Sequence, residues 1–248
     1  MKFVLLSIVL FELITVHSLC LDSKRYCVAL TMHNATTVTA KQQPNHNQVL
    51  KSNPADFIPK GYILFERING DLNKDGIDDC VLIIKGTDKQ YIINDEYRGE
   101  LDRNRRGIII LLNKNNQYQV AVKNYDCFSS ENEDGGVYYA PELSVGISNG
   151  KLYVQYSHGR YGYWKYTFRY KSTDFELIGY DASSDRGPVI LSETSINFIT
   201  KKKIVKENTK EDADTGEEIF KVTRNNIVIP ELLKLSAIKD FDALEMNY

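Results

Sequence analysis

Short runs of alternating apolar and polar residues recur along the chain from Gly61 onward, and turn-forming residues separate one run from the next. Successive side chains of a β-strand point to opposite faces of its sheet, so a two-residue period indicates a strand with one face in a core. Runs of this length at a spacing of roughly 8–12 residues are typical of all-β folds. The pattern predicts strands at residues 62–68, 80–85, 107–112, 118–122, 143–147, 152–156, 164–170, 175–180, 195–198, 203–206 and 219–223.

The predicted fold class is all-β: a mostly antiparallel sandwich or a partial propeller-like sheet, with one short C-terminal helix. Residues 230–244 are the one stretch with a helical pattern. No convincing repeat of roughly 20–50 residues is present, and a complete propeller would need one for each blade. We therefore expect a single β-rich domain over residues 60–248, preceded by a polar, irregular N-terminal tail over residues 19–59.

Residues 1–18 have the features of a secretory signal peptide. A basic start at Met1-Lys2 precedes an apolar stretch at residues 3–16 and a small-residue cleavage site at Val16-His17-Ser18. The alternative is a buried N-terminal strand. The stretch contains Glu12 and is too short to span a membrane, and no later run approaches ~18 apolar residues. We expect an exported protein, periplasmic or extracellular, with no transmembrane segment.

Four cysteines remain after the predicted cleavage, and an even number in an exported protein suggests disulfide bonds. Three pairings are open. We expect Cys80–Cys127 within the folded body and Cys20–Cys27 within the tail. A lipid anchor at Cys20 is an alternative, but bulky Leu19 stands where that signal requires a small residue, and lipidation would leave Cys27 without a partner.

The strongest candidate chemistry is an aspartate-rich segment at residues 70–79, which reads Gly-Asp-Leu-Asn-Lys-Asp-Gly-Ile-Asp-Asp. Ca²⁺ takes six to eight oxygen ligands, and a tight loop supplies them from alternate positions with a glycine at the sharp turn. Four aspartates and one lysine give the loop a charge of −3, which a bound cation would neutralise. The alternative is an Asp/Asn/Gly turn without a metal. The predicted ligands are the side chains of Asp71, Asn73, Asp75 and Asp79 and the backbone carbonyl of Ile77.

Position 12 of this loop is Leu82 rather than the glutamate of an EF-hand, and predicted strands rather than helices flank it. We therefore expect a weak site, or one completed by another loop such as residues 131–134. The loop resembles the calcium loops of FG-GAP (integrin-type) repeats and of dockerin-like segments. Together with Ile58-Pro59-Lys60-Gly61-Tyr62, it is similar to exported bacterial proteins with one such loop. A single copy departs from the repeated FG-GAP pattern, so the resemblance does not imply a propeller.

The charge balance narrows the class of partner. The chain has 31 Lys and Arg residues against 33 Asp and Glu, a net charge of −2, and the basic excess of a nucleic-acid or anionic-membrane binder is missing.

Aromatic residues are concentrated at residues 151–181, where Trp164, Tyr166, Phe168 and Tyr170 share one face of a predicted strand. Such faces are usually core, although an aromatic platform for sugars or peptides is the alternative. We expect an unidentified protein or glycan partner.

Catalytic motifs are missing: the chain has no G-x-S-x-G, H-E-x-x-H or P-loop sequence. His158, in a predicted turn, and Asp181, at the start of another loop, are the available acid–base candidates. The sequence thus favours an exported calcium-binding β-domain with a binding or interaction role. The alternative is a secreted hydrolase with a site built from loops near His158 and Asp181.

Overall fold

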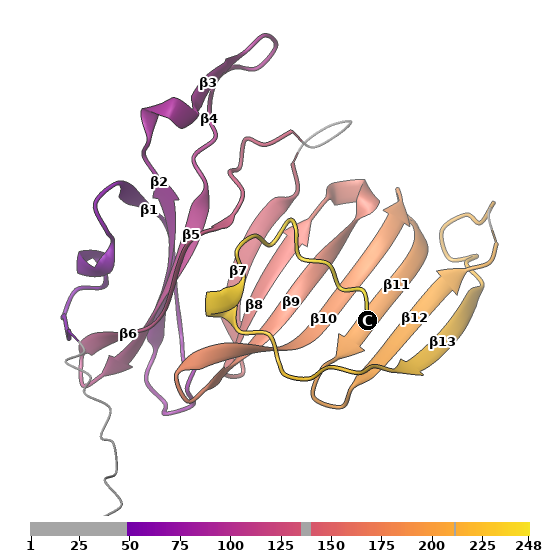
Figure 1. Cartoon of the computed structure of the whole chain (residues 1–248). Coiled ribbons are helices and arrows are strands. Elements are labelled where there is room, and N and C mark those ends of the chain that lie inside the picture. The colour runs from indigo at the N-terminus through magenta and orange to yellow at the C-terminus, as the bar shows by residue number, and fades with distance from the viewer. Residues whose placement is uncertain (1–48, 135–139, 211) are drawn as a thin grey trace, which may run out of the picture. The chain divides into compact units, whose positions relative to one another are not determined.

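The chain folds into antiparallel β-sheets joined by turns and short 3-10 helices (Figure 1). The computed structural model describes residues 49–134, 140–210 and 212–248. Sheets of four, seven and two strands confirm the predicted all-β class. The elements are η1 (Pro54–Phe57), β1 (Tyr62–Gly70), β2 (Asp79–Gly86), η2 (Lys89–Tyr91), β3 (Ile92–Asp95), β4 (Gly99–Asp102), β5 (Arg106–Lys114), β6 (Gln117–Phe128), β7 (Glu142–Ser148), β8 (Lys151–Ser157), η3 (Gly159–Tyr161), β9 (Gly162–Lys171), β10 (Asp174–Arg186), β11 (Val189–Asn197), β12 (Lys202–Asn208), β13 (Phe220–Asn226) and η4 (Leu235–Ala237).

The four-stranded sheet has the order β1-β2-β5-β6 and is covered on both faces. Alternate residues of β2 and β5 enter two separate hydrophobic clusters, as Val81 and Leu82 illustrate. Val81 belongs to the larger cluster, which the two main sheets share, whereas Leu82 belongs to a smaller cluster capped by Phe57 of η1. The folded chain therefore already includes the last residues of the predicted tail. Residues 1–18 and the first part of that tail lie outside the described residues.

The seven-stranded sheet is a meander in which β7 to β13 pair with their neighbours in chain order. On β9, Tyr166 and Phe168 are buried in the larger cluster, and Trp164 and Tyr170 pack against it. The core interpretation of this aromatic face is thus confirmed. In the part of the chain that the structure describes, no helix is long and apolar enough to cross a membrane.

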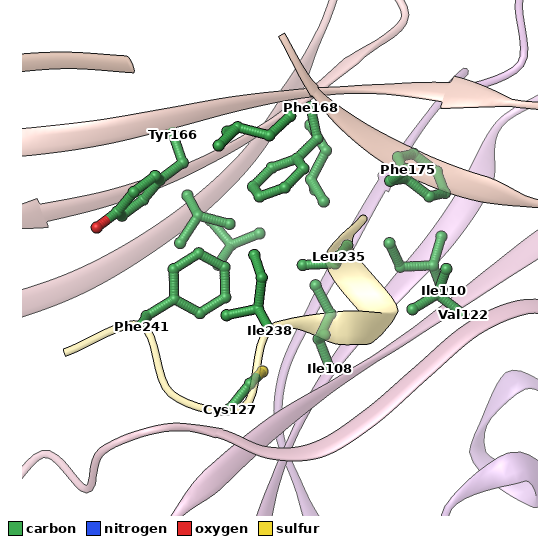
Figure 2. Packing of buried hydrophobic residues seen from close by; sticks show 14 of the residues in the cluster. Ile108, Ile110, Val122, Cys127, Tyr166, Phe168, Phe175, Leu235, Ile238 and Phe241 are labelled. Atoms are coloured by element: carbon green, nitrogen blue, oxygen red, sulfur yellow. The ribbon is translucent and has the colours of Figure 1, made fainter. Parts of the chain in front are cut away.

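The C-terminal strap, residues 227–248, lies between the two main sheets and corrects the predicted helix. Only the three-residue 3-10 helix η4 forms there. The backbone of the strap bonds to the sheets instead: Leu177 N donates to Leu233 O at 2.8 Å, and Phe241 N donates to Cys127 O at 3.0 Å. Figure 2 shows Leu235, Ile238 and Phe241 of the strap packed among residues of both sheets.

The predicted Cys80–Cys127 disulfide is wrong, since both residues are free, buried thiols. Cys80 lies in the cluster under Phe57, whereas Cys127 lies in the cluster on the opposite face of the four-stranded sheet. A disulfide requires the two Cβ atoms to approach within about 4.5 Å, which opposite faces of a sheet do not permit. Cys20 and Cys27 lie outside the described residues.

The long connection between β2 and β5 contains a hairpin, β3–β4, that the sequence pattern does not reveal. Its base is fixed by Lys85 at the end of β2, whose side chain is 6% exposed and pairs with Asp102 at 2.9 Å and with Glu131. Burial alone would lower the pKa of Lys85, but the hydrogen bonds to the two carboxylates outweigh it and raise that pKa. The cluster of three charges therefore anchors the hairpin to the sheet.

Candidate metal centre

The aspartate-rich segment forms the connection between the antiparallel strands β1 and β2. Gly70 and Asp79 are the last paired residues of their ladder, so residues 71–78 make up the loop. Two positions adopt a positive φ, +65° at Lys74 and +85° at Gly76. The glycine stands where the sequence predicts a sharp turn, in a conformation that a Cβ would strain.

The first half of the loop is organised around the carboxylate of Asp71. Its Oδ1 accepts hydrogen bonds from Lys74 N at 2.6 Å and Asp75 N at 3.2 Å, and its Oδ2 accepts from Gly76 N at 2.9 Å. Asn73 Oδ1 also accepts from Asp75 N, and Asn73 Nδ2 donates to Asp75 Oδ2, both at 2.9 Å. The structure thus brings the ligands predicted at positions 1, 3 and 5 into one hydrogen-bonded group.

Asp79 forms the buried inner wall of the loop. Its side chain has no exposed surface, and its two oxygens accept from Leu72 N and Asn113 N, each at 2.9 Å. Burial raises the pKa of Asp79, and the nearby charge of Asp75 adds to that shift, while these backbone hydrogen bonds oppose it. Asp79 therefore links the loop to the end of β5 as well as facing Asp75.

The donor set fits a hard cation because every predicted ligand atom is an oxygen. In the described residues no group of three His, Cys, Asp or Glu side chains is arranged to hold a metal, since the carboxylates bind backbone N–H groups in this conformation. A carboxylate has about four lone-pair sites, however, while the Asp75 carboxylate accepts two described hydrogen bonds and that of Asp79 accepts from Leu72, Asn113 and Asn73. Lone pairs for a cation therefore remain on both.

Asn113 is a residue that sequence reasoning missed. It lies near the end of β5, on the side of Asp79, and its Nδ2 donates to Asp78 O at 3.1 Å. Its side-chain oxygen is buried and has no hydrogen-bond partner among the described residues. The sequence shows only an asparagine just after a predicted strand, and it does not reveal that this strand pairs with β2. Asn113 adds an oxygen beside the loop.

The loop also meets the seven-stranded sheet at the β7–β8 turn. A Cβ on Gly150 of that turn would lie 2.4 Å from Cε of Lys74, and a Cβ on Gly70 would lie 2.8 Å from Cγ2 of Ile147. The residues around these contacts line a shallow depression of about 460 Å³. The conformation of the loop is thus coupled to the contact between the two sheets.

Residues 131–134 do not complete the site. Glu131 pairs with Lys85 at the far end of β2, and Lys85 lies six residue steps along the strand from Asp79, about 20 Å at the rise of a strand. Asp134 pairs with Arg103 at 2.7 Å. This prediction is wrong because these acidic residues serve the β3–β4 end of the sheet.

The two hydrolase candidates, Asp181 and His158, lie on β10 and just before η3. Asp181 accepts a hydrogen bond from Ser195 Oγ at 2.8 Å and pairs with Lys165 at 3.5 Å. His158 precedes η3, where its ring lies 5.2 Å from that of Tyr161. The contacts of Asp181 are those of a cross-strand structural residue.

Comparison with protein-family models, with curated proteins and with solved structures gave no match to this chain.

Proposed function

We propose that this chain is an exported calcium-binding β-domain protein with a binding or interaction role in the periplasm or the cell exterior. The observation that carries the calcium proposal is the β1–β2 loop, in which Asp71, Asn73 and Asp75 form one group of oxygen donors against the buried carboxylate of Asp79. The carbonyl of Ile77 is the proposed backbone ligand. The resemblance to single FG-GAP or dockerin-like loops supports the same assignment.

The proposed role of the metal is structural. A cation offsets the loop charge of −3, and it strengthens a connection that touches both main sheets through Lys74 and Gly70. Without position 12, the affinity falls in the range of extracellular calcium modules, roughly 10⁻⁴–10⁻³ M.

Export rests on the signal-like residues 1–18, since the predicted disulfide of the folded body does not form. The near-neutral charge supports a protein or glycan partner over a nucleic acid.

The test is thermal unfolding of the full chain in 10 mM Ca²⁺ and in EDTA. With a Kd of about 10⁻⁴ M the native state gains about 2.7 kcal/mol, which raises Tm by about 5–10 °C in a chain of this size. Mg²⁺ should raise it less, because it demands a smaller octahedral site. Asp75→Ala should abolish the calcium shift, while Asp214→Ala, at an exposed aspartate of another loop, should retain it. Equal Tm values in calcium and EDTA would refute the proposal.

A further inference from the structure

The seven-stranded sheet ends in an open edge at β13. This strand is the outermost of its sheet and, in the part of the chain that the structure describes, pairs with β12 alone (Figure 1). The ladders from β11 to β13 run without a register shift, and five of the seven residues of β13 are exposed. An edge strand presents N–H and C=O groups to which another strand can bond. The regular edge at β13 can therefore accept a further strand.

Two hydrogen bonds at the ends of β13 show which of its backbone groups face this edge. Ile227 N donates to Lys201 O at 2.9 Å, and Thr209 N donates to Ile219 O at 2.8 Å. Alternate residues of an antiparallel strand bond to the same neighbour, so the odd-numbered residues of β13 bond to β12. The even-numbered residues direct their N–H and C=O groups to the open edge: Phe220, Val222, Arg224 and Asn226.

The edges at β7 and β1 differ from this one. The end of β7 lies against β1, where a Cβ on Gly70 would come within 2.8 Å of Ile147. The pairing of β1 with β2 shifts register between Leu64 and Glu66. A bulge of this kind twists an edge away from regular pairing. Neither strand therefore offers a regular edge of the length that β13 offers.

The two ends of the β12–β13 hairpin carry opposite charges. Residues 212–218, which connect the strands, contain four acidic residues and no basic one, and Lys210 pairs with Glu217 among them. At the other end Lys201 and Lys202 are both exposed, and Lys202 is paired across from Asn226 of β13. An antiparallel copy of the hairpin brings the acidic end of one molecule beside the basic end of the other. A parallel copy would bring like charges together.

We propose that β13 pairs with β13 of a second copy of this chain, antiparallel about a two-fold axis at Thr223. The same strand pairing with itself gives a closed two-fold dimer. An axis at Lys221 would set two lysines opposite each other, which is unfavourable. The axis at Thr223 lies at the middle of β13, so all four edge-facing residues bond, through about eight backbone hydrogen bonds.

The charged side chains of β13 are compatible with this register. Lysine and arginine on an edge strand commonly prevent unwanted pairing. About the axis at Thr223, however, Lys221 stands opposite Asn225 and Arg224 opposite Val222, so no like charges face each other directly. The proposal goes beyond the binding role proposed above, because the partner is a second copy of the chain, and it does not depend on the calcium loop.

The test is sedimentation of the full chain at protein concentrations from about 1 to about 200 µM. One strand a side makes a small interface, so we expect a weak dimer with a Kd on the order of 10–100 µM. The average mass should rise from 28.4 kDa toward twice that value. Val222→Pro removes an N–H that faces the edge and leaves the bonds to β12, so it should weaken the dimer about tenfold or more. Val222→Thr keeps that N–H and should still dimerise.

A second pair of variants tests the antiparallel direction through charge. Lys201→Glu with Lys202→Glu should weaken the dimer, and adding Asp212→Lys with Asp214→Lys to the same chain should restore it. Failure of the second pair to restore the dimer would contradict the antiparallel arrangement. Thermal unfolding of each variant confirms that it is folded.

A mass that stays at 28.4 kDa at every concentration would overturn the proposal, as would a Val222→Pro variant that dimerises like the original chain. Growth beyond the dimer would show an open assembly and overturn the two-fold contact. Each series is run in calcium and in EDTA. A dimer that forms equally in both, in a protein whose Tm ignores calcium, would keep this proposal and refute only the calcium one.

Discussion

Phe241 is one of the strap residues that contact both sheets, and Phe241→Ala should cost about 4 kcal/mol of unfolding free energy. The side chain is 1% exposed, and its ring lies 5.0 Å from Phe128 of β6, 5.1 Å from Tyr166 and 6.2 Å from Phe168 of β9. Burying a phenylalanine stabilises by about 1.5–3 kcal/mol, and the lost ring contacts and the remaining cavity add to the cost of removing it.

The assay is urea unfolding followed by the fluorescence of Trp164, which packs against the same cluster as Phe241. With a slope of about 2 kcal/mol/M, the midpoint should fall by about 2 M, in a single transition because the strap joins both sheets. Tyr97→Ala is the control, because that ring is 90% exposed and its loss should change the midpoint little. A loss below about 1 kcal/mol for Phe241→Ala would refute the packing of the strap between the sheets.

Two further predictions follow from buried polar and sulfur groups. Lys85→Met should lower the free energy of unfolding by about 2 kcal/mol, measured by urea unfolding. The loss is smaller than for a fully buried ion pair because Asp102 and Glu131 are each 36% exposed. Adding Glu131→Gln to the same variant should recover part of the loss. Cys80 and Cys127 should resist alkylation in the native protein, because both are fully buried and burial raises the pKa of each thiol, and should react once it is unfolded. A disulfide-linked peptide pair in a non-reducing digest would contradict the second prediction.

Much of the fold could be predicted because the strands that build the core carry the signal that burial requires. The β9 segment 164–170 alternates aromatic and polar residues, and its aromatic face lies in or against the core. The β3–β4 hairpin could not be found in this way. Of its residues Leu101 alone is buried, so the two-residue period is missing where a strand has no face in the core.

The conformation of the strap and the positions of the cysteines could not be predicted from the local sequence pattern. Residues 230–244 have apolar residues at a helical spacing, but their backbone bonds to β6 and β10, and tertiary contacts override the local propensity. The faces of Cys80 and Cys127 depend on register, and the β5–β6 ladder shifts register between Ile110 and Leu111 and again between Arg106 and Ile108. Each shift changes the face to which later side chains point.

The residues of the candidate metal centre differ in the same way. The aspartate loop is continuous in sequence, so its residues and spacing could be recognised without a structure. Asn113, by contrast, lies more than thirty residues after the loop, and only the pairing of β5 with β2 brings its oxygen beside it.

The strap also has a consequence for the order in which the chain is made. It follows β13 in sequence, yet it supplies Leu235, Ile238 and Phe241 to the core shared by sheets that begin at β1. The ribosome therefore synthesises all the strands before the strap residues that join the two sheets emerge from it. Until then, the apolar faces around Phe168 stay open to solvent or to another chain, and the nascent protein is most exposed to aggregation during this interval.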